Sequence, residues 1–215
     1  MIDRLHYISQ EGPNGETHAE MVQLACQAGV KWVQLRIKDQ SVEAILKQAQ
    51  QARDICNDYD ARLIINDHPE IAKQVNADGV HLGQQDMDVQ DARKLLGDDF
   101  IIGGTCNTSD QLLELINKGV NYVGLGPFRF TSTKKKLSPI LGLEGYESII
   151  KRMRLVGREI PIIAIGGLDW EDITGLRAAG VHGVAMASAI NYAVDARAVV
   201  DQLNKVLHGE FTNSR

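Results

Sequence analysis

One pattern recurs eight times along the chain and limits the folds that it can adopt: a short apolar run is followed by a longer amphipathic segment. Several of the short runs are apolar on both alternating faces, which is typical of parallel strands that are covered on two sides. The longer segments have the length and spacing of helices. The predicted strands span residues 5–9, 31–36, 62–66, 79–83, 100–105, 121–126, 160–167 and 183–188.

The segments between these runs carry residues that start and end helices. Ser41 can cap a helix over residues 42–56, and Thr108 with Gln111 has the spacing of a capping box. Four segments, "QAGV", "NADGV", "NKGV" and "AAGV", place a glycine before the next strand. Glycine tolerates the left-handed conformation that ends many helices, so these segments predict four helix ends.

Strand–helix units repeated eight times in 215 residues favour an α/β fold with one domain, a closed (β/α)8 TIM barrel. A doubly wound open sheet is the alternative, because periodicity alone does not separate a closed sheet from an open one. No long cluster of Pro, Gly or Ser divides the chain. We therefore expect one barrel over residues 1–207 and a flexible C-terminal tail over residues 208–215.

Composition narrows the classes of partner and the compartment. The net charge of −5 argues against a nucleic-acid partner, since such proteins usually carry a basic excess. The three cysteines are too few and too widely spaced for a disulfide framework or a metal site, which favours a reducing cytoplasm. No apolar run approaches the ~18 residues of a membrane span, and the N-terminus lacks the form of a signal peptide. We expect a cytoplasmic protein with small-molecule partners; self-association into a homo-oligomer stays open.

Basic and polar side chains follow the second predicted strand. Gln34, Arg36 and Lys38 alternate with Leu35 and Ile37, so the three polar side chains share one face of an extended segment. On an exposed sheet face this pattern would carry no meaning. In a barrel that face points inward, and cations held away from water need anionic partners. The barrel interpretation therefore favours an anion site here.

Two carboxylates follow the third and fourth predicted strands. Asp67 could be only a helix cap ahead of Pro69, whereas Asp86 has no such role, because Asp88 is better placed to cap the next helix. Both architectures gather the carboxyl ends of parallel strands at one place. Carboxylates from neighbouring units could hold Mg²⁺, which usually takes one or two carboxylates with phosphate oxygens and waters.

A glycine pair follows the seventh predicted strand, at Gly166 and Gly167. The pair could be only a tight turn. It also exposes backbone N–H groups at a helix start, where anions bind, and barrels commonly place a phosphate at the loops after strands seven and eight. This is the phosphate site that physical reasoning supports best.

No nucleophile can be recognised. His68 and His81 are isolated histidines, which are more often structural, and Cys106 has no obvious base beside it. The chain contains neither a P-loop motif nor a recognisable Ser–His–Asp arrangement. The pattern therefore favours catalysis by positioning and charge neutralisation.

Taken together, seven segments resemble the thiamine phosphate synthase family, and the resemblance covers about residues 5–190. Each segment is weak alone, and their order makes the resemblance specific. The segments are "QLRIKD", "IINDHPEIA", "ADGVHLGQQD", "GLGPFRFTSTKKK", "GLEG", "IAIGGL" and "GVAMASAI". The family is a (β/α)8 barrel of transferases that joins hydroxymethylpyrimidine diphosphate to a thiazole phosphate, giving thiamine phosphate and diphosphate.

The resemblance implies a role for each strand-end residue. Those expected to contact the pyrimidine diphosphate are Gln34, Arg36, Lys38, Asn66, Thr105 and Lys134, of which Arg36, Lys38 and Lys134 would be catalytic. Those expected to hold the thiazole phosphate are Thr131, Ser132, Thr133, Gly167, Ala187 and Ser188. Asp67 and Asp86 resemble the ligands of the Mg²⁺ cofactor. The implied mechanism is a dissociative step through a pyrimidine cation, which the thiazole nitrogen captures.

The chain departs from the family pattern at four positions. Thr105 stands where serine is usual, Asn107 where histidine is common, Ile37 where glutamate is frequent and Phe130 where proline is frequent. These changes bear on loop conformation and substrate affinity more than on the type of reaction.

Three other interpretations are compatible with parts of the pattern. A thiazole tautomerase of the related family would need no diphosphate site, against which Arg36, Lys38, Asp67, Asp86 and Lys134 argue. A sugar-phosphate isomerase or aldolase would need a general base or a Schiff-base lysine, for which Lys38 is the strand-end candidate. A barrel that binds thiamine precursors without catalysis would show tight binding and no product.

Overall fold

The sheet closes on itself: each of the eight strands pairs in parallel with the next, and β8 pairs with β1. The computed structural model describes residues 1–130 and 139–209. Closure confirms the TIM barrel and rules out the open doubly wound sheet. The strands are β1 (Leu5–Ile8), β2 (Trp32–Leu35), β3 (Arg62–Asn66), β4 (Gly79–Leu82), β5 (Ile101–Cys106), β6 (Tyr122–Leu125), β7 (Ile162–Ala164) and β8 (Gly183–Met186).

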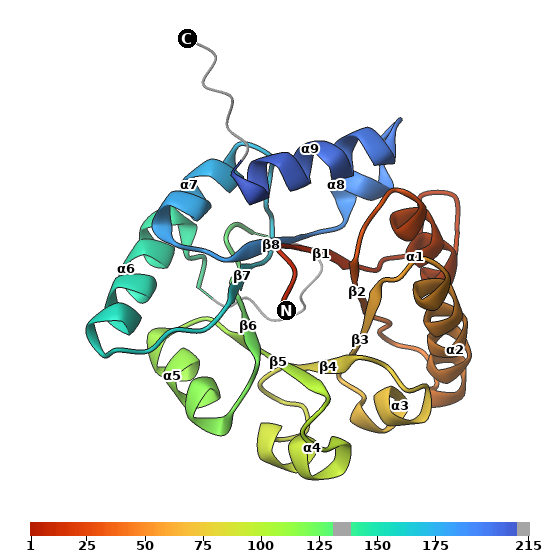
Figure 1. The fold of residues 1–215 in the computed structure, drawn as a ribbon, viewed down its shortest axis with the longest axis horizontal. Coiled ribbons are helices and arrows are strands. Elements are labelled where there is room, and N and C mark those ends of the chain that lie inside the picture. Colours follow the sequence, from red (N-terminus) through yellow and green to blue (C-terminus); the bar gives the residue numbers. More distant parts are fainter. Residues whose placement is uncertain (131–138, 210–215) are drawn as a thin grey trace.

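Helices form an outer ring around the strands (Figure 1). Each strand is followed by a helix that returns the chain to the start of the next strand, the arrangement that a parallel barrel requires. The helices are α1 (His18–Gln27), α2 (Val42–Asp58), α3 (Pro69–Gln74), α4 (Val89–Leu96), α5 (Ser109–Lys118), α6 (Gly142–Leu155), α7 (Asp172–Ala179), α8 (Ser188–Asn191) and α9 (Ala196–His208).

The predicted helix starts at α2 and α5 are confirmed. The Ser41 side chain accepts the Ala44 N–H, and Thr108 forms a capping box with Gln111. Such a cap contributes about 0.5–2 kcal/mol, because it satisfies N–H groups that the first helical turn leaves without partners. The sequence therefore fixes where these helices begin.

Glycine ends three of the four helices for which we expected it. Gly29, Gly119 and Gly180 have φ values of 103°, 85° and 104°. After α3 the left-handed residue is Asn76, with φ of 50°, and Gly79 is the first residue of β4. Asparagine also tolerates this conformation, because its short polar side chain can hydrogen-bond locally, so the prediction of a terminating glycine was wrong at this helix.

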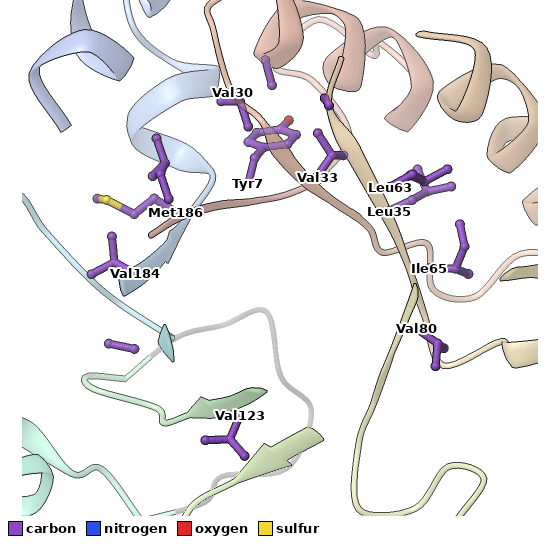
Figure 2. Packing of buried hydrophobic residues seen from close by; sticks show 14 of the residues in the cluster. Tyr7, Val30, Val33, Leu35, Leu63, Ile65, Val80, Val123, Val184 and Met186 are labelled. Atoms are coloured by element: carbon purple, nitrogen blue, oxygen red, sulfur yellow. The ribbon is translucent and has the colours of Figure 1, made fainter. Parts of the chain in front are cut away.

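Outward-facing strand residues pack against the helices. Figure 2 shows side chains from alternate positions of β2 and β3, among them Val33, Leu35, Leu63 and Ile65, on the side of the strands where the helices lie. These four side chains are fully or almost fully buried. Each contributes about 1.5–3 kcal/mol when removed from water, so this layer holds the helices on the barrel.

The inward-facing strand residues form a second, separate cluster inside the barrel. It consists of the buried Trp32, Ile64, Tyr122, Ile163 and Ala185. His6 stacks on Trp32 with ring centroids 4.5 Å apart, and its edge meets Tyr122. This cluster fills the barrel below the carboxyl ends of the strands and forms the floor of the cavities described below.

The C-terminal part of the chain ends the fold with α9, which runs to His208 and is capped by Gly209. Residues 210–215 lie outside the described residues, so the predicted flexible tail stays a prediction. None of the helices that the structure describes has the length and apolarity needed to cross a membrane.

Candidate active site

Three charged side chains from the loops after β2, β3 and β4 meet at the mouth of the barrel. The Lys38 ammonium forms an ion pair with the Asp67 carboxylate, and Asp67 shares a hydrogen bond with Asp86. Asp86 also accepts the Gly83 N–H at 2.6 Å. The expectation that the two carboxylates lie at one end of the molecule is met, because β3 and β4 are adjacent parallel strands that end together.

Neither carboxylate serves as a helix cap. Asp67 has a φ of 65°, and α3 begins after His68 with Pro69 in its first turn and no side-chain cap. Asp88 caps α4 by accepting the Gln90 N–H at 2.8 Å, as its position in the sequence indicated. The left-handed backbone at Asp67 is uncommon for a residue other than glycine, so its geometry directs the carboxylate to Asp86 and Lys38 rather than to a helix start.

The pKa values of the two carboxyl groups shift in opposite directions. Burial tends to raise the pKa of Asp67, but the hydrogen bond with Asp86 and the Lys38 ammonium outweigh burial and lower that pKa. Burial and then the hydrogen bond with Asp67 raise the pKa of Asp86. Two close carboxyl groups with pKa values driven apart share one proton, and a divalent cation can take the place of that proton.

The donor set here suits one kind of metal. The described residues contain no group of three or more His, Cys, Asp or Glu side chains that could hold a metal ion. Two carboxylates alone do not make a closed transition-metal site. They do fit Mg²⁺, which keeps waters and fills its remaining positions with substrate phosphate oxygens.

A small inner cavity of about 60 Å³ lies above the aromatic floor of the barrel. Gln34 donates to the Asn66 side-chain oxygen at 3.0 Å across one wall of the cavity. The Asn66 Nδ2 group is buried and has no partner among the described residues. A buried donor without a partner is costly, so this amide is set to bind an acceptor atom of a ligand.

The adjoining wall of the inner cavity, from β4 to β6, holds a chain of hydrogen bonds. The His81 ring contacts the Tyr122 hydroxyl through Nδ1 at 3.0 Å and the Thr105 hydroxyl through Nε2 at 2.8 Å. Burial raises the pKa of Tyr122, so the phenol keeps its proton and can donate it to Nδ1. In that tautomer His81 Nε2–H donates to Thr105, which leaves the Thr105 hydroxyl proton for a ligand.

Sequence reasoning assigned His81 no role, yet it lines the inner cavity. One signal could have found it: Gly103 of β5 and Gly124 of β6 lie next to this ring. A Cβ atom at Gly103 would lie 2.3 Å from the Tyr122 ring and 2.6 Å from His81 Nδ1. Glycine at this inward position therefore makes room for the paired rings.

Arg36 lies between the inner cavity and a larger outer one, and it lines both. Its backbone N–H donates to the Ser9 hydroxyl at 3.0 Å, and that hydroxyl contacts His18 Nδ1 at 2.8 Å. Ser9 and His18 are both buried. The end of β2 is thus tied to β1 and α1, which fixes the place of the arginine. No local pattern in the sequence indicated this support.

The outer cavity has a volume of about 200 Å³ and lies at the ends of β7 and β8. The predicted phosphate residues Gly167, Ala187 and Ser188 line it together with Gly166 and Leu168. Gly166 and Gly167 have φ values of 87° and 68°, a conformation that other residues rarely adopt. The structure thus brings the predicted residues of loops seven and eight to one cavity.

The loop after β6 is described only in part. The predicted residues Thr131, Ser132, Thr133 and Lys134 lie outside the described residues, so their roles stay predictions. The Asn107 side chain donates to the carbonyls of Gly126 and Pro139, each at 2.9 Å. Asn107 therefore joins the two described ends of this loop beside the cavities.

Two of the other departures from the family pattern, Ile37 and Phe130, lie away from the cavities. Ile37 is buried in the outer core, whereas Phe130 is 63% exposed. Neither residue lines the inner or the outer cavity. Thr105 lines the inner cavity and keeps the hydroxyl of the usual serine.

Comparison with known sequences decides the family. The profile of the family described as thiamine monophosphate synthase matches residues 5–190. The chain belongs to the thiamine monophosphate synthase family. The recognition made from the seven segments is confirmed, as is the prediction of an enzyme of the transferase class.

Curated relatives named thiamine-phosphate synthase match this chain over almost their whole length. The thiamine-phosphate synthase of Flavobacterium psychrophilum is 42% identical over 96% of this chain and 100% of its own. That of Bacteroides fragilis strain ATCC 25285 is 44% identical over 95% of this chain and 98% of its own. Membership therefore extends over the entire barrel and not only over a shared motif.

Solved structures agree with this fold. Thiamine phosphate pyrophosphorylase from Pyrococcus furiosus superimposes with a TM-score of 0.81 at 29% identity, covering 95% of both chains. Orotidine 5'-phosphate decarboxylase from Pyrococcus horikoshii superimposes with a TM-score of 0.65 at 16% identity, covering 95% of this chain and 99% of its own. The second similarity shows the barrel fold alone, so the family assignment rests on sequence.

Proposed function

We propose that this member of the family joins 4-amino-2-methyl-5-hydroxymethylpyrimidine diphosphate to 4-methyl-5-(2-phosphoethyl)thiazole, releasing thiamine phosphate and diphosphate with the help of Mg²⁺. The observation that carries the proposal is the pair of adjoining cavities. Ile8, Arg36, Ile165 and Ala185 line both of them. Two substrates placed in these cavities would meet at that common wall.

The inner cavity suits an aminopyrimidine ring. Its wall offers the Asn66 amide donor, which has no partner among the described residues, and the Thr105 hydroxyl. The apolar side chains of Ile8, Ile163 and Ile165 also line it. Directed hydrogen bonds around a flat apolar slot are the means by which proteins orient a heteroaromatic ring.

The mouth of the barrel suits the diphosphate. Arg36 lines both cavities, and Lys38 lies with Asp67 and Asp86 at the neighbouring strand ends. Asp67 and Asp86 would hold Mg²⁺, which supplies positive charge to the leaving diphosphate. Lys134, from the segment outside the described residues, is proposed as a further cation.

The chain's own residues then act by position and charge. Arg36 and Lys38 would stabilise negative charge as the bond between the pyrimidine methylene carbon and the diphosphate oxygen breaks. The electron-rich aminopyrimidine would delocalise the resulting positive charge. The thiazole, held by its phosphate in the outer cavity, would present its ring nitrogen to that carbon. No protein nucleophile is needed in this mechanism.

A reconstitution experiment tests the proposal. Purified protein, both phosphorylated precursors and Mg²⁺ should give thiamine phosphate and diphosphate, measured by chromatography and by a diphosphate assay. EDTA should abolish product, and added Mg²⁺ should restore it, because the leaving group would otherwise stay uncompensated.

Two outcomes would contradict the proposal. Product formation that is unchanged in excess EDTA would rule out the metal-assisted step. Isomerisation of a thiazole carboxylate phosphate without any coupling would assign the chain to tautomerase chemistry instead.

A further inference from the structure

Arg129, in the described stem of the loop after β6, reaches across to the loop after β7. Its guanidinium binds the Asp172 carboxylate in two contacts, one of them 2.6 Å from Nη2 to Oδ1. Nη1 also donates to the Gly167 carbonyl at 3.3 Å, and the guanidinium lies over the Phe128 ring at 4.9 Å. One side chain thus engages a helix start, a backbone carbonyl and a ring.

The backbone of the same stem reinforces this connection. The N–H groups of Phe128 and Arg129 both donate to the Gly166 carbonyl at 3.0 Å. A Cβ atom at Gly167 would lie 2.9 Å from Arg129 Cβ and 3.0 Å from the Phe130 carbonyl oxygen. The stem is therefore in close contact with the glycine pair that lines the outer cavity.

These contacts set the direction of two peptide planes. In a trans peptide the C=O and N–H groups point in opposite directions, so the carbonyls of Gly166 and Gly167, held by the stem, turn the following N–H groups away from it. Those N–H groups belong to Gly167 and Leu168, which both line the outer cavity. Neither group donates to an acceptor among the described residues. Successive N–H groups without partners form an anion-binding concavity.

The loop beside the glycine pair carries acidic residues, whose negative charge Arg129 offsets. Asp169, Glu171 and Asp172 follow the pair within a few residues. Arg129 Nη1 lies 3.6 Å from Asp169 Oδ2 in addition to its contacts with Asp172. A loop of this charge would repel a phosphate unless a cation compensated it.

We propose that Arg129 is a positioning residue for the phosphate of the thiazole substrate, because its side chain holds the Gly167 carbonyl and compensates Asp172. This inference rests on the proposed function. Arg129 would favour binding of the phosphate monoester, which it does not touch, rather than binding of the thiazole ring or of the pyrimidine diphosphate.

Kinetics of Arg129→Ala test this role. The KM for thiazole phosphate should rise about tenfold, since charge-assisted hydrogen bonds of this kind are lost. The kcat and the KM for the pyrimidine diphosphate should stay within about twofold. Arg129→Lys should recover part of the loss, because an ammonium can still pair with Asp172 but lacks the forked geometry that also reaches Gly167.

A matched control is available on the same barrel. Arg152 is a comparably exposed arginine that pairs with Asp110 at 2.8 Å, and it lines neither cavity. Arg152→Ala should leave both KM values unchanged. A fall in kcat with both KM values unchanged in Arg129→Ala, or equal changes in both KM values, would overturn the proposal.

A double substitution separates orientation of the backbone from charge compensation. If Arg129 acted only by compensating Asp172, Arg129→Ala combined with Asp172→Asn would return the KM for thiazole phosphate to the wild-type value, and that result would overturn the orienting role. We expect the KM to stay raised at least about fivefold, because the Gly167 carbonyl is still released.

Direct binding keeps this inference distinct from the proposed function. Absence of coupling by the wild-type protein would refute the function. Calorimetric titration with thiazole phosphate needs no turnover, and Arg129→Ala should weaken binding about tenfold there too. Equal affinities of wild type and variant would refute the role of Arg129 even in an active enzyme.

Discussion

At the scale of single residues, Arg36 connects the two cavities. It lines both, and its backbone is held by the buried Ser9 hydroxyl. The alternation of Gln34, Arg36 and Lys38 predicted one shared face. The structure brings Gln34 to Asn66 and Lys38 to Asp67, so the same alternation places one residue on the wall of the inner cavity and another at the mouth of the barrel.

Removal of the Arg36 guanidinium should impair the chemical step. We expect Arg36→Ala to fold normally and to lose about 10²–10³-fold in kcat, or about 2.7–4 kcal/mol of transition-state stabilisation, as for other lost electrostatic donors. Steady-state kinetics and a thermal melt measure the two effects. The exposed Arg158, which follows α6, provides the control, and Arg158→Ala should keep full activity. Near-normal turnover of Arg36→Ala would remove the arginine from the mechanism.

At the scale of elements, the barrel brings together loops whose contacts with one another cannot be predicted from their residue types alone. The stem of the loop after β6 packs on the loop after β7, while Asn107, at the end of β5, holds the two described ends of the former loop. From the resemblance, histidine was expected at position 107. Here the side-chain amide performs a structural task, donating to two carbonyls at once.

Loss of the Asn107 amide should therefore destabilise the loop and the protein. Asn107→Ala leaves the buried Gly126 carbonyl with one fewer donor, and we expect the free energy of unfolding to fall by about 1–3 kcal/mol. Urea denaturation measures this change. Asn57, exposed in the last turn of α2, is the control, since Asn57→Ala should stay within about 0.5 kcal/mol of wild type. An Asn107→Ala variant as stable as wild type would show that water replaces both hydrogen bonds.

At the scale of the whole molecule, the folded barrel buries histidine rings that would take up protons more readily in water. Burial lowers the pKa of His6 well below its usual value, and burial also lowers the pKa of His18. The Asp3 carbonyl accepts a hydrogen bond from the His6 ring and raises the His6 pKa, but burial outweighs this effect. Glu11 raises the pKa of His18, and Arg36 lowers it. Both shifts favour the neutral ring in the folded protein.

Stability should fall as the pH is lowered through about 6.5, the ordinary histidine pKa. The unfolded chain binds more protons there than the folded protein, because both pKa values are lower in the folded protein, so each histidine can remove up to about 1.4 kcal/mol per pH unit below that value. Urea denaturation at pH 7.5 and at pH 5.5 measures this loss. His18→Asn, which keeps an acceptor for Ser9, should reduce the difference, and replacement of the exposed His208 by Gln should not. An unchanged difference in His18→Asn would contradict the assignment.

The sequence by itself determined the eightfold alternation, three of the helix caps and the family, because these depend on local periodicity, local hydrogen bonding and the order of short segments. It also indicated that Asp67 and Asp86 belong together, since neighbouring parallel strands end at the same edge. Only the tertiary structure decided that the sheet closes and that His81 lies between Tyr122 and Thr105. It also decided that Ser9 supports Arg36 and that Arg129 reaches Asp172. Those contacts join residues far apart in the chain, and no local pattern encodes which distant side chains a closed barrel will bring within hydrogen-bonding distance.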